Sequence, residues 1–231
     1  DELSRVVKIA SDLKKVQKVY LRLTPGVDAH THEFISTAHE DVKFGFSIAS
    51  GDAQIAIDKC MAESSLNLVG IHCHIGSQIF EVSGFELAAQ RLVAVLVAFR
   101  DKYSKELAEL NLGGGYGIAY TKNESAISPA QVIPAIAKVI KSECEKAKLS
   151  IPKISIEPGR AIVGPTTTTI YMVGTTKSVT LENGAKRRYV SVDGGMSENI
   201  RPALYGATYS AFLANRNSSA NAISSRIVGK H

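Results

Sequence analysis

Short apolar segments alternate with helical segments over the first 164 residues, and this alternation constrains the fold of the chain more than any other feature. Four apolar segments are typical of buried strands and occupy residues 16–27, 66–76, 107–117 and 152–160. Helical spacing marks residues 1–13, 50–64, 84–103 and 128–149. The second of these helices offers Ser50 or Asp52 as its N-cap, and the last begins with Ser-Pro. Because parallel strands need a crossover connection, the order predicts an α/β fold with a parallel sheet covered by helices.

The pattern changes after Gly164. Segments rich in Thr, Val and Tyr follow without a long helix between them, at residues 166–179, 185–195 and 208–216. Such segments are typical of antiparallel β structure. We therefore place a domain boundary near Gly164, with a parallel α/β domain in residues 1–164 and the start of an antiparallel β domain in residues 165–231. A complete eight-unit barrel needs about 250 residues, so the first domain would be only part of one.

Composition excludes several classes of protein. The chain has 231 residues, of which 45% are hydrophobic and 21% charged, an ordinary globular balance. The net charge of +5 is spread along the chain without basic blocks, which does not favour nucleic-acid binding. No apolar run reaches the roughly 18 residues that suggest a transmembrane helix. The three cysteines form no Cys-x-x-Cys pair, which predicts buried, reduced thiols in a cytoplasmic protein.

Two of the expected strands end in residues that suit an anion. Gly113, Gly114 and Gly115 remove side chains at a strand end, so that backbone N–H groups can approach a phosphate; a tight turn is the alternative. The run does not fit the GxxxxGK[ST] pattern of a nucleotide-binding P-loop. Glu157 and Arg160 flank a Pro-Gly turn. They offer a carboxylate to a cationic ring nitrogen and a guanidinium to a phosphate or carboxylate, unless they form a surface ion pair.

A third strand ends in the sequence GIHCHIGSQIF, at residues 70–80. Alternation along the strand places His72 and His74 on one face and Cys73 on the other. Two imidazoles could bind a metal, but a third ligand at a recognisable spacing is missing. Other histidines lie in a separate segment, as His30, His32 and His39. The alternatives are a buried core histidine, or a flat face of His74 for a planar ligand with the Ser77 hydroxyl on its phosphate. Together the three strand ends favour pyridoxal phosphate, a planar cationic ring that carries a phosphate.

The motifs at these strand ends resemble a known family. GIHCHIGSQ, LNLGGGYGI, IEPGRAIVG and YVSVDGGMSENIRPALYGA are similar, in this order, to the fold-type III pyridoxal-phosphate decarboxylases. The resemblance covers essentially the whole chain and implies an alanine-racemase-like (β/α)8 barrel followed by a β domain. Residues 1–164 would be the C-terminal part of the barrel that binds pyridoxal phosphate, and residues 165–231 the start of the β domain. It is greatest for the branch that decarboxylates meso-2,6-diaminopimelate to L-lysine and carbon dioxide in lysine biosynthesis.

The resemblance also implies roles for particular residues. His74 would stack on the cofactor ring, and Glu157 would pair with the ring nitrogen. The phosphate would be held by Ser77 and by the loop of Gly113, Gly114 and Gly115. The turn after Glu157 would also bind the cofactor, through Pro158, Gly159 and Arg160. The substrate would be bound by Arg160, Arg201 and Tyr205. No residue of this chain is expected to bind a metal.

Two features of the family are missing from this sequence. The lysine that forms the Schiff base lies in a YAxKAN-like motif, and the proton-donating cysteine lies in a CESGD motif; neither motif is present. We therefore expect the central part of such an enzyme, inactive by itself, from a homodimer with shared sites. The alternatives are a decarboxylase of the same fold that acts on arginine, ornithine or carboxynorspermidine, an inactive cofactor-binding fragment, or a metal-dependent hydrolase that uses His72 and His74.

Overall fold

The computed structural model describes residues 2–27, 43–221 and 223–230. These residues divide into two compact units. The first unit comprises residues 1–118 and 125–165, and the second comprises residues 119–124 and 166–231. Each unit has its own sheet, so the two are described separately.

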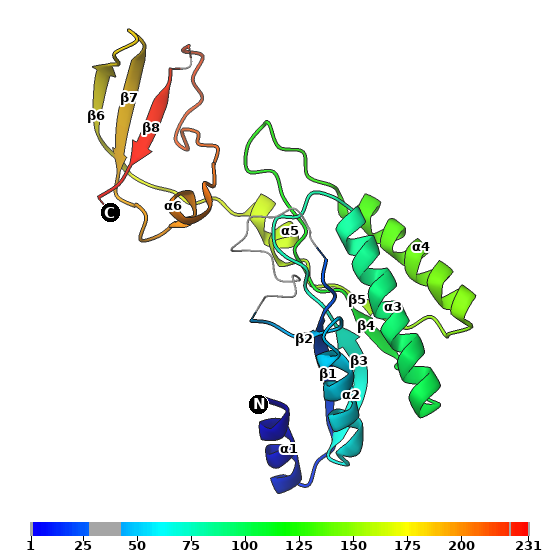
Figure 1. Cartoon of the computed structure of the whole chain (residues 1–231). Helices are drawn as coiled ribbons and strands as arrows, with labels where there is room; N and C mark the ends of the chain where they lie inside the picture. Colours follow the sequence, from blue (N-terminus) through cyan, green and yellow to red (C-terminus); the bar gives the residue numbers. More distant parts are fainter. Residues whose placement is uncertain (1, 28–42, 222, 231) are drawn as a thin grey trace. The chain divides into compact units, whose positions relative to one another are not determined.

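The first unit is a parallel sheet with helical connections. Its helices are α1 (Glu2–Asp12), α2 (Asp52–Ala62), α3 (Ser83–Tyr103), α4 (Pro129–Ala147) and α5 (Gly159–Val163), and a 3-10 turn at Gly164–Thr166 follows where this unit ends. Its strands are β1 (Gln17–Thr24), β2 (Phe46–Ser47), β3 (Leu66–His72), β4 (Glu109–Asn111) and β5 (Lys153–Ser155). They lie in the order β2-β1-β3-β4-β5, and every neighbouring pair is parallel. This confirms the predicted α/β fold, and Figure 1 shows α3 and α4 side by side.

Strand register gives the sheet an apolar face and a polar face. One row of side chains across four strands consists of Leu21, Ile71, Leu110 and Ile154. These side chains pack in the hydrophobic core together with the buried faces of the helices. Because side chains alternate along a strand, the next row lies on the opposite face. That row consists of Arg22, His72, Asn111 and Ser155. The helices therefore bury one face, and the other carries polar groups to the carboxyl ends of the strands.

Local sequence signals set the starts of two helices in different ways. The Ser-Pro start of α4 is confirmed, because Ser128 and Gln131 form a reciprocal capping box before the first turn. The prediction of Ser50 or Asp52 as the N-cap of α2 is wrong, since Gly51 occupies that position with φ +85°. The Ser50 hydroxyl instead donates to the Asp52 carboxylate at 2.7 Å. A left-handed turn that suits glycine therefore starts α2.

The second unit contains a small mixed sheet. Its elements are β6 (Val173–Thr180), β7 (Lys186–Val192), α6 (Arg201–Tyr205) and β8 (Ser225–Val228). β6 and β7 are antiparallel, as expected, whereas β8 pairs with β7 in parallel. The expectation of a wholly antiparallel sheet is wrong for that pair, because the long connection between the two strands returns the chain to the end where β7 begins.

The strand expected at residues 208–216 is also absent from the described structure. The backbone N–H of Ser210 donates to the carbonyl oxygen of Tyr120 at 3.2 Å, which is an isolated contact outside any strand ladder. The third strand is β8, further along the chain. The predicted position of the third strand is therefore wrong. Strand-like composition does not show which segment of the chain meets the open edge of a neighbouring strand.

The cysteines of the chain are buried and unbridged, as predicted, at Cys60, Cys73 and Cys144. Cys73 directs its thiol toward the Leu112 carbonyl, on the face opposite to His72. Among the described residues, no helix has the length and apolar character needed to cross a membrane.

Candidate functional site

Three loops that follow β3, β4 and β5 meet at one edge of the sheet. These strands are neighbours and run parallel, so their carboxyl ends lie together (Figure 1). Backbone hydrogen bonds join the loops directly: Glu157 N–H donates to Gly113 O at 2.8 Å, and Ile79 N–H donates to Gly115 O at 2.9 Å. The fold therefore brings together the candidate residues that the sequence places at all three strand ends.

The glycine run allows this close packing. A Cβ at any of Gly113, Gly114 or Gly115 would come closer than 3.0 Å to a backbone carbonyl oxygen of a neighbouring loop. Gly113 and Gly115 also have φ values of +68° and +105°, which L side chains rarely adopt. The glycines are thus required by the contact between loops as well as by the turn.

His74 is held as a neutral ring with a defined tautomer. The N–H of Gly114 donates to Nδ1 of His74 at 3.1 Å, so a neutral ring carries its proton on Nε2. Burial lowers the pKa of His74, and the positive charge of Arg22 lowers it further, while Glu157 opposes the shift. A half-buried, uncharged imidazole presents a flat face that suits an aromatic ring.

Arg160 and Ser77 form a candidate anion site. Arg160 Nη2 donates to Ser77 Oγ at 3.1 Å, and Nη1 donates to Gln78 Oε1 at 2.9 Å. Gln78 is itself fixed by Ile118, because its Nε2 donates to the Ile118 carbonyl at 2.6 Å and its Oε1 accepts from the Ile118 N–H at 3.2 Å. A guanidinium beside a hydroxyl is a suitable donor set for a phosphate.

Glu157 presents a partly exposed carboxylate at the same edge. Its Oε1 accepts a hydrogen bond from Asn111 Nδ2 at 3.0 Å, and His72 Nε2 lies 3.6 Å from the same oxygen. The side chain of Glu157 is 53% exposed. Burial lowers the pKa of His72, although the neighbouring carboxylate of Glu157 acts to raise it. Glu157 is therefore a negative charge that a cationic ligand could reach from solvent.

The donor set fits pyridoxal phosphate. A flat neutral ring at His74, a hydroxyl and guanidinium at Ser77 and Arg160, and a carboxylate at Glu157 match its ring, its phosphate and its ring nitrogen. Pro158 and Gly159 form the turn between Glu157 and Arg160, where Gly159 N–H donates to Glu157 O at 2.9 Å.

A metal site finds no support in the part of the chain that the structure describes. There, no group of three or more His, Cys, Asp or Glu side chains could hold a metal ion. His72 and His74 instead contact Glu157 and Gly114. The remaining histidines, His30, His32, His39 and His231, lie outside the described residues.

Arg201 and Tyr205 lie in the second unit, at the two ends of α6. The single helical turn places them on one side, as predicted: the Arg201 guanidinium lies over the Tyr205 ring, 5.1 Å from its centroid. Arg201 Nε also donates to Tyr209 Oη at 3.1 Å. The guanidinium is therefore oriented by two phenol side chains, one of which the sequence did not indicate.

Sequence reasoning assigned no role to Asn111 and Gln78. Asn111 uses both ends of its carboxamide to connect Gly113 with Glu157, whereas Gln78 accepts from Arg160 and is fixed at both ends by the backbone of Ile118. Asn111 could have been found from the sequence because it is a polar residue at the end of a short apolar strand, where site residues of parallel sheets lie. Gln78 adopts φ +61°, and its place directly after Ser77 was the signal there.

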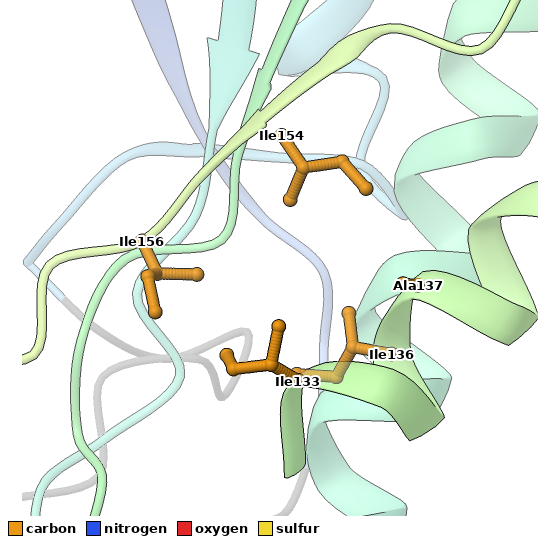
Figure 2. Close-up of a pocket in the computed structure, with 5 residues that line it drawn as sticks. All are labelled: Ile133, Ile136, Ala137, Ile154 and Ile156. Carbon is orange, nitrogen blue, oxygen red and sulfur yellow. The ribbon is translucent and has the colours of Figure 1, made fainter. Parts of the chain in front are cut away.

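An apolar cavity elsewhere in the first unit does not fit the same ligand. It has a volume of about 140 Å³ and lies between α4 and the β5 segment. Figure 2 shows that its lining is entirely aliphatic, from Ile133, Ile136, Ala137, Ile154 and Ile156. No side chain that lines it offers a polar partner to a phosphate or a cationic ring.

Comparison with known proteins identifies related sequences and structures. Residues 1–164 match the family described as "Pyridoxal-dependent decarboxylase, pyridoxal binding domain". The diaminopimelate decarboxylases of Corynebacterium efficiens and Mycobacterium tuberculosis are 47% and 50% identical over 230 and 234 residues. These alignments cover 100% of this chain and 50% and 52% of those proteins. The chain thus spans about half the length of these curated relatives.

A solved structure agrees with this relationship. Diaminopimelate decarboxylase from Helicobacter pylori, complexed with L-lysine, superimposes with a TM-score of 0.83 at 27% identity. The match covers 100% of this chain and 53% of that one. The fold of this chain, including the parallel sheet that carries the candidate site, is therefore the fold of the matching half of that enzyme.

Proposed function

This chain belongs to the pyridoxal-dependent decarboxylase family, and from that premise we propose that its protein converts meso-2,6-diaminopimelate to L-lysine and carbon dioxide. Relatives that carry this activity in their names are 47% and 50% identical over the whole chain. The observation that carries the proposal is the grouping of His74, Ser77, Glu157 and Arg160 around the glycine loop, at the ends of the three adjoining strands β3, β4 and β5.

Each of these residues has a separate task. The imidazole face of His74 would support the cofactor ring, and the guanidinium of Arg160 with the hydroxyl of Ser77 would bind the phosphate. The carboxylate of Glu157 would hold a proton on the ring nitrogen. When bound, pyridoxal phosphate supplies an electron sink for the electron pair that decarboxylation leaves behind. A protonated ring nitrogen strengthens that sink, so Glu157 acts on the rate as well as on binding.

The glycine loop contributes in two ways. The N–H groups of Gly113 and Gly114 already donate to Asn111 and His74, and so fix the loop. Within the described residues, the N–H of Gly115 donates to no protein acceptor, which supports Gly115 as the amide that meets the phosphate.

Arg201 and Tyr205 support the choice of substrate. A guanidinium oriented by phenols suits a carboxylate, and diaminopimelate differs from lysine by a second carboxylate. The enzyme must grip one end of the substrate while the other loses carbon dioxide. An arginine or ornithine decarboxylase would need an acidic group to receive the distal cation of its substrate.

We also propose a setting for these sites within the protein. Residues 1–164 would be the C-terminal part of a (β/α)8 barrel that binds the cofactor, and residues 165–231 would begin a β domain. The protein would act as a homodimer with shared sites. Its three buried, unbridged cysteines support a reducing compartment such as the cytoplasm.

The decisive experiment uses the complete gene product, because the Schiff-base lysine motif of the family has no counterpart in these 231 residues. The protein is loaded with pyridoxal phosphate, and release of carbon dioxide is measured with diaminopimelate, arginine, ornithine and carboxynorspermidine in parallel. Turnover of diaminopimelate with lysine as the product is expected. Preference for one of the other three substrates would overturn the proposed specificity, and failure to bind the cofactor would overturn the proposed function.

A further inference from the structure

Asn111 connects two parts of the candidate site through a single carboxamide. It is the last residue of β4 and lies on the polar face of the sheet between His72 and Ser155. Its Oδ1 accepts from the N–H of Gly113 at 2.8 Å, and its Nδ2 donates to Glu157 Oε1 at 3.0 Å. Since a backbone N–H can only donate, the oxygen must face Gly113 and the amino group must face the carboxylate.

These contacts form part of a closed ring of three hydrogen bonds. The third bond runs from the N–H of Glu157 to the carbonyl oxygen of Gly113 at 2.8 Å. Asn111, Gly113 and Glu157 are thus each bonded to the other two. The ring joins the end of β4 to the end of β5, so the direction of the Glu157 carboxylate is tied to the position of the glycine loop.

The ring leaves one carboxylate oxygen of Glu157 for a ligand. Asn111 and the nearby His72 both approach Oε1. Among the described residues, no donor forms a hydrogen bond with Oε2. A glutamate side chain that is 53% exposed would otherwise sample several rotamers, so the bond from Asn111 selects an orientation.

We propose that Asn111 is a positioning residue that aims the free oxygen of Glu157 at the cofactor ring nitrogen and holds the glycine loop in register with it. This inference rests on the proposed function, since it assigns a supporting residue to the same site. Asn111 itself meets neither cofactor nor substrate; it acts through Glu157 and Gly113.

The test is Asn111→Asp in the complete protein. Aspartate has nearly the same shape and can still accept from Gly113 N–H, but it places a carboxylate oxygen where the donor to Glu157 stood. The matched control is Asn67→Asp, which adds the same charge at an exposed position in β3, near the opposite end of the strand. The dissociation constant of pyridoxal phosphate is measured by absorbance titration, and the thermal midpoint of unfolding reports on the fold.

The dissociation constant should rise about tenfold to a hundredfold in Asn111→Asp, as expected for loss of a hydrogen bond to a charged group. Asn67→Asp should change it less than about twofold, and the thermal midpoint should stay near that of the parent. If Asn111→Asp does not fold, Asn111→Ser is used, because serine adds no charge and is too short to reach both partners. Unchanged cofactor affinity in the folded variant would overturn the inference.

A second substitution separates an effect through Glu157 from a general effect of charge. In a Glu157→Gln background, the new glutamine amide can donate to the carboxylate that Asn111→Asp introduces, so the pair is restored with its donor reversed. Asn111→Asp should then weaken cofactor binding less than about threefold. A full tenfold loss in this background would overturn the inference, because Asn111 would not be acting through Glu157. If the parent protein itself binds no cofactor, the proposed function fails instead, which keeps the two failures distinct.

Discussion

Gly114→Ala tests whether the three strand-end loops are packed as tightly as the structure shows. A Cβ at this position would come closer than 3.0 Å to the carbonyl oxygen of Glu157, and 3.3 Å from its carbonyl carbon. Both atoms belong to backbone, so no rotamer change can relieve the overlap. Gly114 does not have a positive φ, and the cost therefore arises from contact and not from backbone strain.

The expected magnitude follows from two opposing terms. Overpacking at a tight site costs about 1–3 kcal/mol, and an overlap with backbone places this variant near the upper end. Replacing glycine by alanine also restricts the unfolded chain, which stabilises the folded state by about 0.4–1 kcal/mol. The net expectation is a free energy of unfolding lower by about 1–2.5 kcal/mol.

Gly159→Ala is the matched control, because a Cβ there meets nothing within 4 Å and the residue begins α5. The same unfolded-state term applies to both variants and cancels in their difference. Gly114→Ala should therefore be less stable than Gly159→Ala by about 2–3 kcal/mol in denaturant unfolding of the complete protein. It should also bind pyridoxal phosphate more weakly, since the overlap displaces Glu157. Equal stability of the two variants, within about 0.5 kcal/mol, would refute the packing argument.

Three further predictions address the ring, the substrate and the acid stability of the first unit. His74→Ala should raise the dissociation constant of the cofactor about two- to tenfold, from the roughly 0.5–1.5 kcal/mol of an aromatic contact, and His72→Ala should raise it less; equal effects would count against the assignment. Arg201→Lys should raise KM for diaminopimelate, with a loss of binding free energy of about 1.5–3 kcal/mol and with unchanged cofactor absorbance. Loss of the cofactor with unchanged KM would show that Arg201 belongs to the cofactor site and not to the substrate site. Hydrogen bonds, led by that from Lys102, lower the pKa of Asp58 to about 2, so the ionised carboxylate stabilises the fold above about pH 4 and this contribution disappears as pH falls toward 2. In unfolding measurements, the difference in stability between Asp58→Asn and the parent should therefore disappear over that pH range. A difference that does not change with pH would contradict this.

Part of the site was predictable because local sequence carries the signal. Apolar segments spaced by helical patterns predicted that β1, β3, β4 and β5 form a parallel sheet, and parallel strands place their carboxyl ends at one edge; their order within the sheet came from the structure. His74, Ser77, Glu157 and Arg160 follow those strands directly, so their place at that edge needed only the parallel arrangement. The error at residues 208–216 has the opposite cause, because strand pairing depends on a partner edge that local composition does not describe.

What the sequence determined is the set of chemical groups at the edge of the sheet: an imidazole, a hydroxyl, a guanidinium, a carboxylate and a run of residues without side chains. What the tertiary structure decided is how each group is used. The glycines were interpreted as freeing N–H groups for an anion, yet Gly113 and Gly114 donate to Asn111 and His74, and the space beside them is filled by carbonyls of other loops. A sequence shows that a side chain is missing, but only the packing of distant segments shows what occupies its place.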